Sequence, residues 1–248
     1  MDIQQDIQKG KRCTAIVLAA GQGKRMGTSV QKQFIELDGK PLIYYPLRVF
    51  QDSEWIDEIV LVAGSGQVPY VRDEIVKRYH FDKVSAVVEG GRERYDSVWQ
   101  GLKLIKSERE CSHREAGYIF IHDGARPFVD GEIIRRGYQT VRQYSACVAG
   151  MPSKDTIKLV DEDEFAVRTP KRKYVWIVQT PQIFDETLII EAYSRLTREE
   201  CINVTDDAMV VEEMMGVPVK LFEGSYENIK ITTPDDLKIA RAFLEAWE

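Results

Sequence analysis

The chain has 248 residues with a formal net charge of −6 at pH 7, and 44% of its residues are hydrophobic. This length suits one domain with a sizeable core, and an acidic chain without an obvious basic face argues against a nucleic-acid polymer as partner. The polar N-terminus predicts no signal peptide, no apolar run is long enough to cross a membrane, and the four cysteines are scattered without CxxC spacing, so we expect a cytoplasmic protein with reduced thiols.

The first predicted strand is the apolar run at residues 15–20, which lacks helical spacing and is typical of a strand buried on both faces. The chain then turns at Gly21 and Gly23 and continues with the cations Lys24 and Arg25. Glycines let backbone amides approach a ligand, and amides beside clustered cations form a site for a polyanion.

Two common phosphate-binding loops are excluded. A Walker A loop needs serine or threonine after Gly-Lys, where this chain has Arg25. A dinucleotide fingerprint needs a third glycine at the position of Met26, which also argues against a dehydrogenase. An ordinary Gly-rich turn with solvated cations remains an alternative reading of this loop.

Strands and helices alternate along the first 150 residues. Further strands are predicted at 58–63, 84–89, 118–122 and 146–151, with helices at 41–50, 68–79, 95–105 and 131–144. This alternation predicts an α/β fold with a doubly wound, mostly parallel, Rossmann-like sheet. We expect a single domain over 13–248 behind a flexible leader at 1–12. Ligands of such sheets gather beyond the carboxyl ends of the strands, where the Gly-rich loops lie.

The alternation stops after residue 151. Segments 156–160 and 165–169 flank an acidic turn and predict a β-hairpin in a protruding arm at about 151–178. A strand at 175–178 returns to the body, followed by helices at 185–194 and 206–215 and a strand at 217–222. Thr205 is the expected N-cap of the second of these helices. The last helix is expected to begin at Thr233-Pro234, with Asp236 closing a capping box.

Motifs at the strand ends and beyond resemble a single family. They are Leu18-Ala19-Ala20-Gly21-x-Gly23-x-Arg25-Met26 with Lys32, Gly90-Gly91…Arg94…Asp96-Ser97-Val98, His122-Asp123-Gly124-Ala125-Arg126-Pro127, Asp155-Thr156, Arg172, Thr180-Pro181-Gln182, Thr205-Asp206 and Asn228-Ile229-Lys230. The first motif alone indicates sugar- and polyol-phosphate nucleotidyltransferases, with their GT-A-like fold. The whole set resembles the 2-C-methyl-D-erythritol 4-phosphate cytidylyltransferases, from about residue 13 to the C-terminus.

The resemblance implies a reaction. A phosphomonoester oxygen of methylerythritol phosphate attacks the α-phosphorus of CTP and pyrophosphate leaves, a step of non-mevalonate isoprenoid precursor biosynthesis. A phosphate monoester is largely ionised at neutral pH, so no general base is required. By resemblance, Arg25 and Lys32 are the catalytic residues, which place positive charge on the reacting phosphates. Mg²⁺ is expected with the triphosphate, and the sequence does not identify its ligands.

The remaining roles are also implied by the resemblance. The expected nucleotide-binding residues are Ala19, Ala20, Gly21, Gly23, Gly91, Ser97 and Gly124, and the expected polyol-phosphate residues are Asp123, Arg126, Thr156, Arg172, Thr205 and Lys230. Arg172 and Lys230 would grip the phosphate. The family also implies a homodimer in which each arm completes the partner's site, and the apolar side of the hairpin gives a twofold partner something to cover.

Several alternatives remain open at this point. Asp123 could cap the following turn, Arg126 could form a surface ion pair, and His122 reads as a packed strand-end residue rather than a catalyst. The chain departs from the family at Gln31, where proline is common, and at Arg92, where an acidic or small residue is common. Rival functions are a cytidylyltransferase for another polyol phosphate, such as ribitol 5-phosphate, and a nucleotide-binding regulatory protein without catalysis.

Overall fold

A seven-stranded sheet forms the centre of the molecule. The computed structural model describes residues 10–21, 31–196 and 204–247. Within them the strand order is β11-β7-β10-β6-β1-β4-β5. The strands are β1 (Cys13–Ala19), β4 (Glu58–Ala63), β5 (Val84–Glu89), β6 (Tyr118–Asp123), β7 (Ala146–Pro152), β10 (Trp176–Asp185) and β11 (Lys220–Glu223). β10 runs antiparallel to β6 and β7, and the other neighbours are parallel. The predicted α/β class with a mostly parallel sheet is confirmed.

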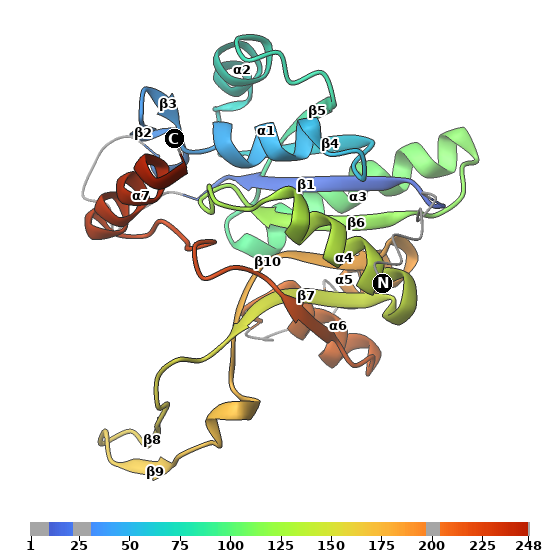
Figure 1. Ribbon diagram of the computed structural model, residues 1–248. Coiled ribbons are helices and arrows are strands. Elements are labelled where there is room, and N and C mark those ends of the chain that lie inside the picture. Colours follow the sequence, from blue (N-terminus) through green and yellow to red (C-terminus); the bar gives the residue numbers. More distant parts are fainter. Residues whose placement is uncertain (1–9, 22–30, 197–203, 248) are drawn as a thin grey trace, which may run out of the picture.

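Helices cover both faces of this sheet (Figure 1). One core packs α1 (Tyr44–Asp52) and α4 (Gly131–Tyr144) on the sheet, and the other packs α3 (Arg94–Ser112), α5 (Glu186–Leu196) and α6 (Asp207–Met215) on the opposite face. β1 supplies both cores, because successive side chains of a strand point to opposite faces. Val17 belongs to the first core and Ile16 to the second.

A smaller cluster joins the last helix to a short hairpin. α7 (Pro234–Trp247) lies beside β2 (Glu36–Leu37) and β3 (Lys40–Pro41), and Leu37, Phe128 and Ile231 are buried between them. The predicted capping box is present, since the Asp236 carboxylate accepts from the Thr233 amide at 2.8 Å and the Asp236 amide donates to the Thr233 hydroxyl at 3.4 Å.

Two local predictions were wrong, and the helix predicted at 68–79 is present but is mostly π-helical. Pro41 lies in β3 rather than in a first helical turn, because the amide of Leu42 still pairs with Ile35 and the helix begins only at Tyr44. The second helix is a short α2 (Val68–Tyr70) that continues as a π-helical turn (Val71–Lys77). The N-cap of α6 is Asp206, not Thr205: its carboxylate accepts from the Met209 amide at 2.9 Å, and a negative charge also suits the helix dipole.

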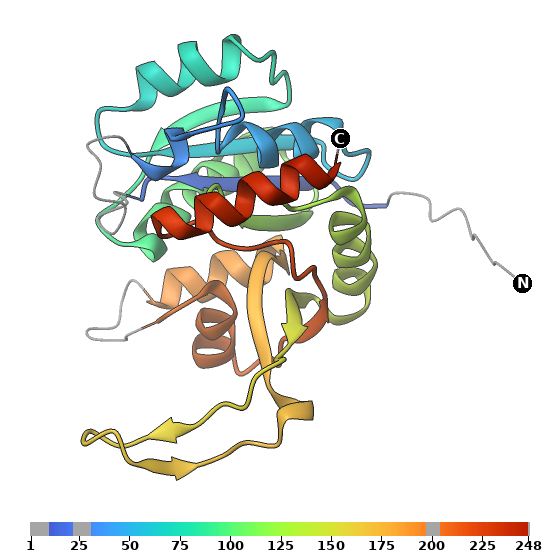
Figure 2. The same ribbon diagram turned by 60° about the vertical axis from the view of Figure 1, so that its left-hand side comes forward.

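The arm stands away from the body (Figures 1 and 2). Its hairpin consists of β8 (Leu159–Val160) and β9 (Ala166–Arg168), which pair antiparallel, and a 3₁₀ turn (Arg172–Tyr174) leads back to β10. Phe165 is 73% exposed and Val167 is 64% exposed. Elsewhere, none of the described helices has the length and apolarity needed to cross a membrane.

Gly117 provides a test of the sheet's tight packing. It precedes β6, where its amide donates to the buried Glu186 carboxylate at 2.9 Å, and a Cβ at this position would overlap the carbonyl oxygen of Arg12. We predict that Gly117→Ala lowers the free energy of unfolding by about 1–3 kcal/mol, because backbone must shift to admit the methyl group. Urea unfolding measures the change.

Gly131→Ala is the matched control, since a Cβ there meets nothing within 4 Å. It should leave the free energy of unfolding nearly unchanged. Equal stability of the two variants would contradict the close approach at Gly117.

Candidate active site

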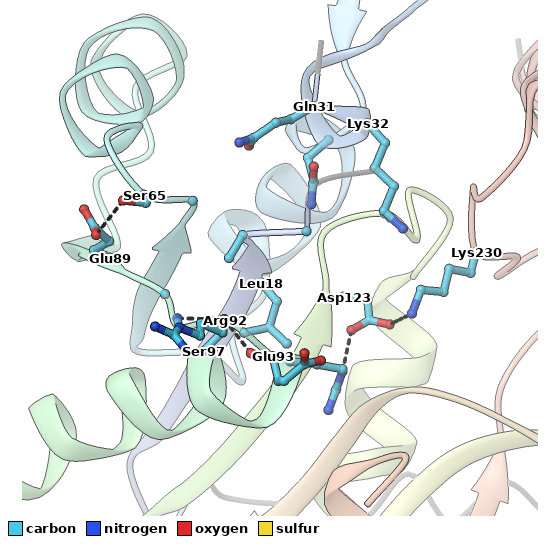
Figure 3. A pocket seen from close by; sticks show the side chains of 18 residues that line it. Leu18, Gln31, Lys32, Ser65, Glu89, Arg92, Glu93, Ser97, Asp123 and Lys230 are labelled. Carbon is cyan, nitrogen blue, oxygen red and sulfur yellow. Dashed lines mark hydrogen bonds and ion pairs between the residues drawn. The ribbon is translucent and has the colours of Figure 1, made fainter. Parts of the chain in front are cut away.

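A cavity of about 510 Å³ opens beyond the carboxyl ends of β1, β4, β5 and β6 (Figure 3). Residues from four loops and from the segment before α7 line it: Leu18, Ala20, Gly21, Gln31, Lys32, Gln33, Gly64, Ser65, Glu89, Gly90, Gly91, Arg92, Glu93, Arg94, Ser97, Asp123, Ala125 and Lys230. Seven predicted site residues therefore share one cavity, namely Ala20, Gly21, Lys32, Gly91, Ser97, Asp123 and Lys230. The cavity lies where the strand-end rule for α/β sheets predicts a ligand site.

The Gly90-Gly91 loop forms one wall and is bonded to the start of α3. The Ser97 hydroxyl accepts from the Gly91 amide and donates to the Glu93 carbonyl, both at 3.1 Å. A Cβ at Gly90 would come within 2.7 Å of the Ser97 hydroxyl, and one at Gly91 would overlap Asp96. Bare backbone is therefore required here, and it leaves a wall without side chains that a flat ring could approach.

Lys32 enters the cavity from a short hydrogen-bonded turn. Lys32–Phe34 form a 3₁₀ turn in which the Phe34 amide donates to the Gln31 carbonyl at 2.9 Å. Gln31 has φ −60°, which proline would also adopt, so its substitution for the family's common proline keeps the same backbone. The predicted residues Gly23 and Arg25 lie outside the described part of the chain.

The opposite wall carries a buried carboxylate. Asp123 is 8% exposed, and its two oxygens accept from Lys230 Nζ at 2.7 Å and from Arg94 Nε at 3.1 Å (Figure 3). Burial by itself would raise the pKa of Asp123, but the charges of Arg94 and Lys230 outweigh it and hold that pKa well below its ordinary range. The residue is thus an ionised group that faces the cavity rather than only a turn cap.

Arg94 belongs to the Gly90-Gly91 motif, but the sequence alone predicts no role for it. Its terminal nitrogens donate to both oxygens of Asp207 at 2.8 and 2.9 Å, and Tyr193 Oη donates to the same carboxylate at 2.6 Å. The Asp207 side chain is fully buried. The signal in the sequence was weak, because Asp207 lies 113 positions away on another helix.

His122 holds the two ends of the Asp123–Arg126 turn. Its Nε2 faces the Arg126 carbonyl oxygen at 3.1 Å; because a carbonyl only accepts, we assign the ring proton to Nε2. Nδ1 then accepts from the Thr180 hydroxyl at 3.0 Å, and that oxygen accepts from the Asp123 amide at 3.1 Å. Burial lowers the pKa of His122 to about 4, so the ring is neutral at pH 7. Its reading as a packed residue without a catalytic role fits this geometry.

The other predicted polyol-phosphate residues lie outside this cavity. Arg126 donates to the Asn228 carbonyl at 2.8 Å and borders a second cavity of about 440 Å³, which also involves Lys230, Asp155 and Ile157 at the base of the arm. Neither cavity is lined by Ala19, Gly124, Thr156, Arg172 or Thr205.

These five residues have other surroundings. Ala19 ends β1, and the Gly124 amide donates to the Leu18 carbonyl at 2.9 Å. Thr156 and Arg172 are exposed on the arm, where Arg172 donates to the Lys154 carbonyl at 3.2 Å. Thr205 is exposed beside the N-cap of α6.

Comparisons with known proteins agree in fold and in family. Residues 13–246 match the sequence model described as IspD, 2-C-methyl-D-erythritol 4-phosphate cytidylyltransferase. A protein of that name from Lachnospira eligens is 51% identical over 233 residues, covering 94% of this chain and 99% of its own length. A second, from Alkaliphilus oremlandii, is 44% identical over 234 residues, covering 94% and 95%. The crystal structure of 4-diphosphocytidyl-2C-methyl-D-erythritol synthase from Anaerococcus prevotii matches with TM-score 0.79 and 33% identity over 95% of this chain and 96% of that one.

The buried imidazole predicts an acid-sensitive stability. Between the ordinary histidine pKa of about 6.5 and the folded value of about 4, the unfolded chain binds a proton that folded His122 does not bind. The free energy of unfolding should therefore fall as the pH is lowered through this window, by up to about 3 kcal/mol from this group. Urea unfolding at about pH 7 and about pH 4.5 measures the fall.

His122→Gln is the comparison variant, because glutamine offers a donor and an acceptor without titrating. It should be less stable than the parent at pH 7, yet lose less stability on acidification. A parent and variant that lose equal stability over this range would exclude His122 as the cause.

Proposed function

Because the chain belongs to the 2-C-methyl-D-erythritol 4-phosphate cytidylyltransferase family, it is a nucleotidyltransferase, and we propose how its residues perform the reaction. CTP and 2-C-methyl-D-erythritol 4-phosphate react to give 4-diphosphocytidyl-2-C-methyl-D-erythritol and pyrophosphate, in isoprenoid precursor biosynthesis. One observation carries the assignment of the site: a single cavity joins a bare-backbone wall at Gly90-Gly91 to an anionic and cationic wall at Asp123 and Lys230.

We assign the first wall to the nucleotide and the second to the polyol phosphate. The wall without side chains at Gly90-Gly91 gives a flat cytosine ring room to approach, and Ala20 and Gly21 lie where the ribose and triphosphate would follow. Lys230 would hold the phosphate of the acceptor, and Asp123 would accept hydrogen bonds from its hydroxyl groups. The side chains of Lys32 and Lys230 point toward the same part of the cavity, which is where the two phosphates would meet (Figure 3).

The chemistry then requires charge rather than a proton acceptor. The acceptor phosphate is already a nucleophile near neutral pH, and His122, the histidine nearest to the cavity wall, is bonded on both nitrogens within the protein. Lys32, together with Arg25, would offset the negative charge that shifts onto the leaving pyrophosphate. The role of Arg25 rests on the family motif, whereas Lys32 is also seen to line the cavity.

Mg²⁺ fits this site as a partner of the triphosphate. Among the described residues no group of three or more histidine, cysteine, aspartate or glutamate side chains is placed to hold a metal ion. The Asp123 carboxylate is already engaged by two cations, so the phosphates would supply most of the oxygen ligands, as Mg²⁺ commonly accepts. When bound, the ion would supply positive charge across the triphosphate.

A cytoplasmic homodimer with shared sites completes the proposal. The arm exposes Leu159, Phe165 and Val167, which a second copy could cover. At the base of the arm, the second cavity brings Asp155 and Ile157 next to Lys230. Thr156 lies between Asp155 and Ile157 in the sequence, and Arg172 lies in the 3₁₀ turn that leads back from the arm to β10. We propose that both reach the acceptor phosphate of the neighbouring subunit.

Pyrophosphate release from CTP tests the function directly. Methylerythritol phosphate and ribitol 5-phosphate are compared side by side under the same conditions, with Mg²⁺ and with a chelator. We expect release with methylerythritol phosphate in the presence of Mg²⁺. Preference for ribitol 5-phosphate would favour the rival polyol specificity, and no release with either would favour a regulatory protein.

Lys230→Ala tests the division of the cavity. Loss of a charged hydrogen-bond donor to the phosphate should lower kcat/KM for the polyol phosphate by about 10- to 100-fold, mainly through KM. CTP affinity in a binding titration should change little. Lys238→Ala is the control, since Lys238 is an exposed lysine on α7 that pairs with Asp235. An equal loss of CTP affinity in Lys230→Ala would place this lysine in the nucleotide half.

Mixed dimers test the shared site. Lys32→Ala removes a residue of one subunit's own cavity, and Arg172→Ala removes a residue proposed to act in the partner's cavity. Each variant alone should be nearly inactive, whereas one site of a mixed dimer keeps both native residues and should regain part of the activity. Mixed dimers that form but stay inactive, or a fully active monomer in sedimentation, would exclude sharing.

A further inference from the structure

We propose that Arg94 is a positioning residue that keeps the Asp123 carboxylate in place when Lys230 leaves it for the acceptor phosphate. The inference rests on the proposed function, in which Lys230 holds that phosphate. Arg94 itself contacts neither the acceptor nor the reacting atoms in this scheme.

The first step is the competition for Lys230. Its ammonium group donates to Asp123 Oδ2 at 2.7 Å, while Asp123 Oδ1 accepts from Arg94. A phosphate dianion carries more charge than a carboxylate and would draw the flexible lysine side chain toward itself. Asp123 would then lose one of its two cation contacts at the moment when a second anion arrives.

Arg94 can hold the Asp123 carboxylate without Lys230, because its own guanidinium is fixed on the side away from Asp123. Two of its nitrogens form a fork with Asp207, which is fully buried and also accepts from Tyr193. The third nitrogen, Nε, is thereby aimed at Asp123. A planar guanidinium can form this two-nitrogen fork with one carboxylate and still aim a third nitrogen at another, whereas the donors of a lysine share one nitrogen and form no such fork.

The charges around Asp123 determine how removal of Arg94 would change the protonation of this carboxylate. Arg94 faces it from α3, Lys230 from the segment before α7 and Arg126 from the turn after β6, with neutral His122 adjacent in sequence. Behind Arg94 lie Asp207 and Tyr193. Without the guanidinium, Lys230 and Arg126 would remain among these neighbours to offset the desolvation of buried Asp123, and Asp207 would add repulsion. Protonation of Asp123 would therefore become easier.

Arg94 also borders the nucleotide wall. It is the first residue of α3, directly after the loop whose glycines form that wall, and the helix start is fixed by the capping box of Glu93 and Asp96. The start of α3 thus fixes the position of the loop beside the proposed nucleotide site and also the direction from which Arg94 contacts Asp123.

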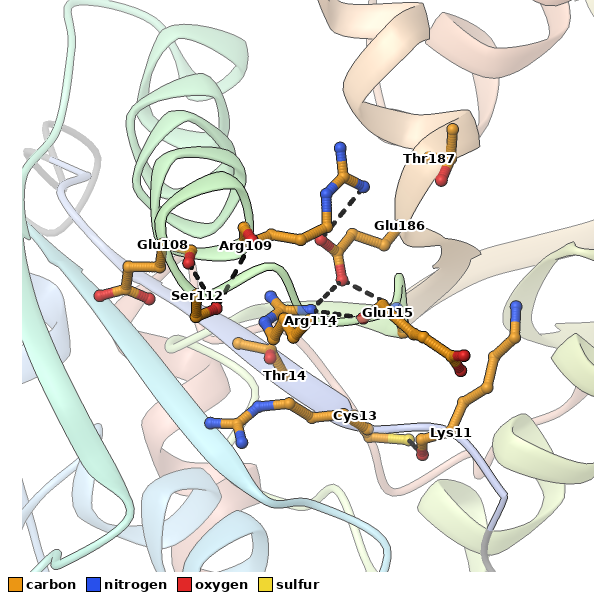
Figure 4. A network of polar contacts seen from close by, with 12 residues as sticks. Lys11, Cys13, Thr14, Glu108, Arg109, Ser112, Arg114, Glu115, Glu186 and Thr187 are labelled. Atoms are coloured by element: carbon orange, nitrogen blue, oxygen red, sulfur yellow. Dashed lines mark hydrogen bonds and ion pairs between the residues drawn. The ribbon is translucent and has the colours of Figure 1, made fainter.

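The experiment compares Arg94→Gln, Arg94→Lys and Arg114→Gln in the full-length protein. Arg114→Gln is the matched control: Arg114 also pairs with a buried carboxylate, Glu186, at 2.8 Å, and its side chain is 20% exposed against 27% for Arg94. That pair lies at the amino ends of β1 and β6, away from the cavity, and Glu186 keeps a contact with Arg109 at 3.4 Å (Figure 4).

Two readouts are measured. The first is kcat/KM for methylerythritol phosphate from about pH 4.5 to about pH 8.5 at saturating CTP. The second is the ¹³C resonance of the Asp123 carboxyl carbon over the same range, assigned by its absence in Asp123→Asn, which does not depend on activity. CTP affinity is measured separately.

We expect Arg94→Gln to lower kcat/KM by about 30-fold or more at neutral pH and to show a further acid-side fall that follows the Asp123 resonance. Arg94→Lys should keep Asp123 ionised across the range yet still lower kcat/KM, because it retains the charge without the fork. Arg114→Gln should lose stability and change neither readout.

The proposal is overturned if Arg94→Gln folds but its Asp123 resonance and pH profile match the parent. It is also overturned if Arg94→Lys has parental kcat/KM, which decides the matter when Arg94→Gln does not fold. A parent protein without pyrophosphate release would instead count against the proposed function, and the resonance would still show whether Arg94 keeps Asp123 ionised.

Discussion

The buried carboxylate of Asp123 is the constraint on which the rest of the site depends. A charge at the end of a central strand, 8% exposed, is stable only if other elements bring cations to it. Arg94 arrives from α3 and Lys230 from the segment before α7, and Asp207 on α6 fixes Arg94 in turn. Residues separated by more than a hundred positions are thereby tied to one point of the sheet.

The antiparallel strand β10 adds a second, uncharged support. It lies between β6 and β7, so Thr180 comes beside the end of β6 and its hydroxyl links the Asp123 amide to His122. The same segment binds Asn228, whose side-chain amide donates to the Thr180 carbonyl at 2.9 Å and whose own carbonyl accepts from Arg126. These bonds pair most of the polar groups of the segment, because unpaired donors and acceptors are costly in a dry interior, although Asn228 Oδ1 and Arg126 Nε are buried without a hydrogen-bond partner among the described residues.

The sequence was informative where the signal is local. The strand at 58–63 and the helix at 131–144 have the predicted bounds, since their signals are hydrophobic spacing and, for the helix, the adjacent N-cap Asp130. The place of the cavity also agrees with the prediction that ligands lie beyond the carboxyl ends of the strands. Competing local signals misled at Pro41, which suits a first helical turn as well as a short strand, and at Thr205, which is followed directly by the stronger cap Asp206. The Arg94–Asp207 fork could not be predicted, because nothing in a single sequence pairs two charges 113 positions apart.

The ion pair between Asp123 and Lys230 bears on how such a site selects its ligand. A phosphate that takes Lys230 leaves Asp123 Oδ2 without its donor, and that loss offsets part of the new attraction. In the proposed site, a ligand that also carries hydroxyl groups near its phosphate could return a hydrogen bond to the carboxylate, whereas an anion without an O–H donor could not. If Lys230 holds the acceptor phosphate as proposed, the site would favour a polyol phosphate over an anion of equal charge that lacks such a donor, because discrimination comes from the polar group that the wrong ligand leaves unpaired.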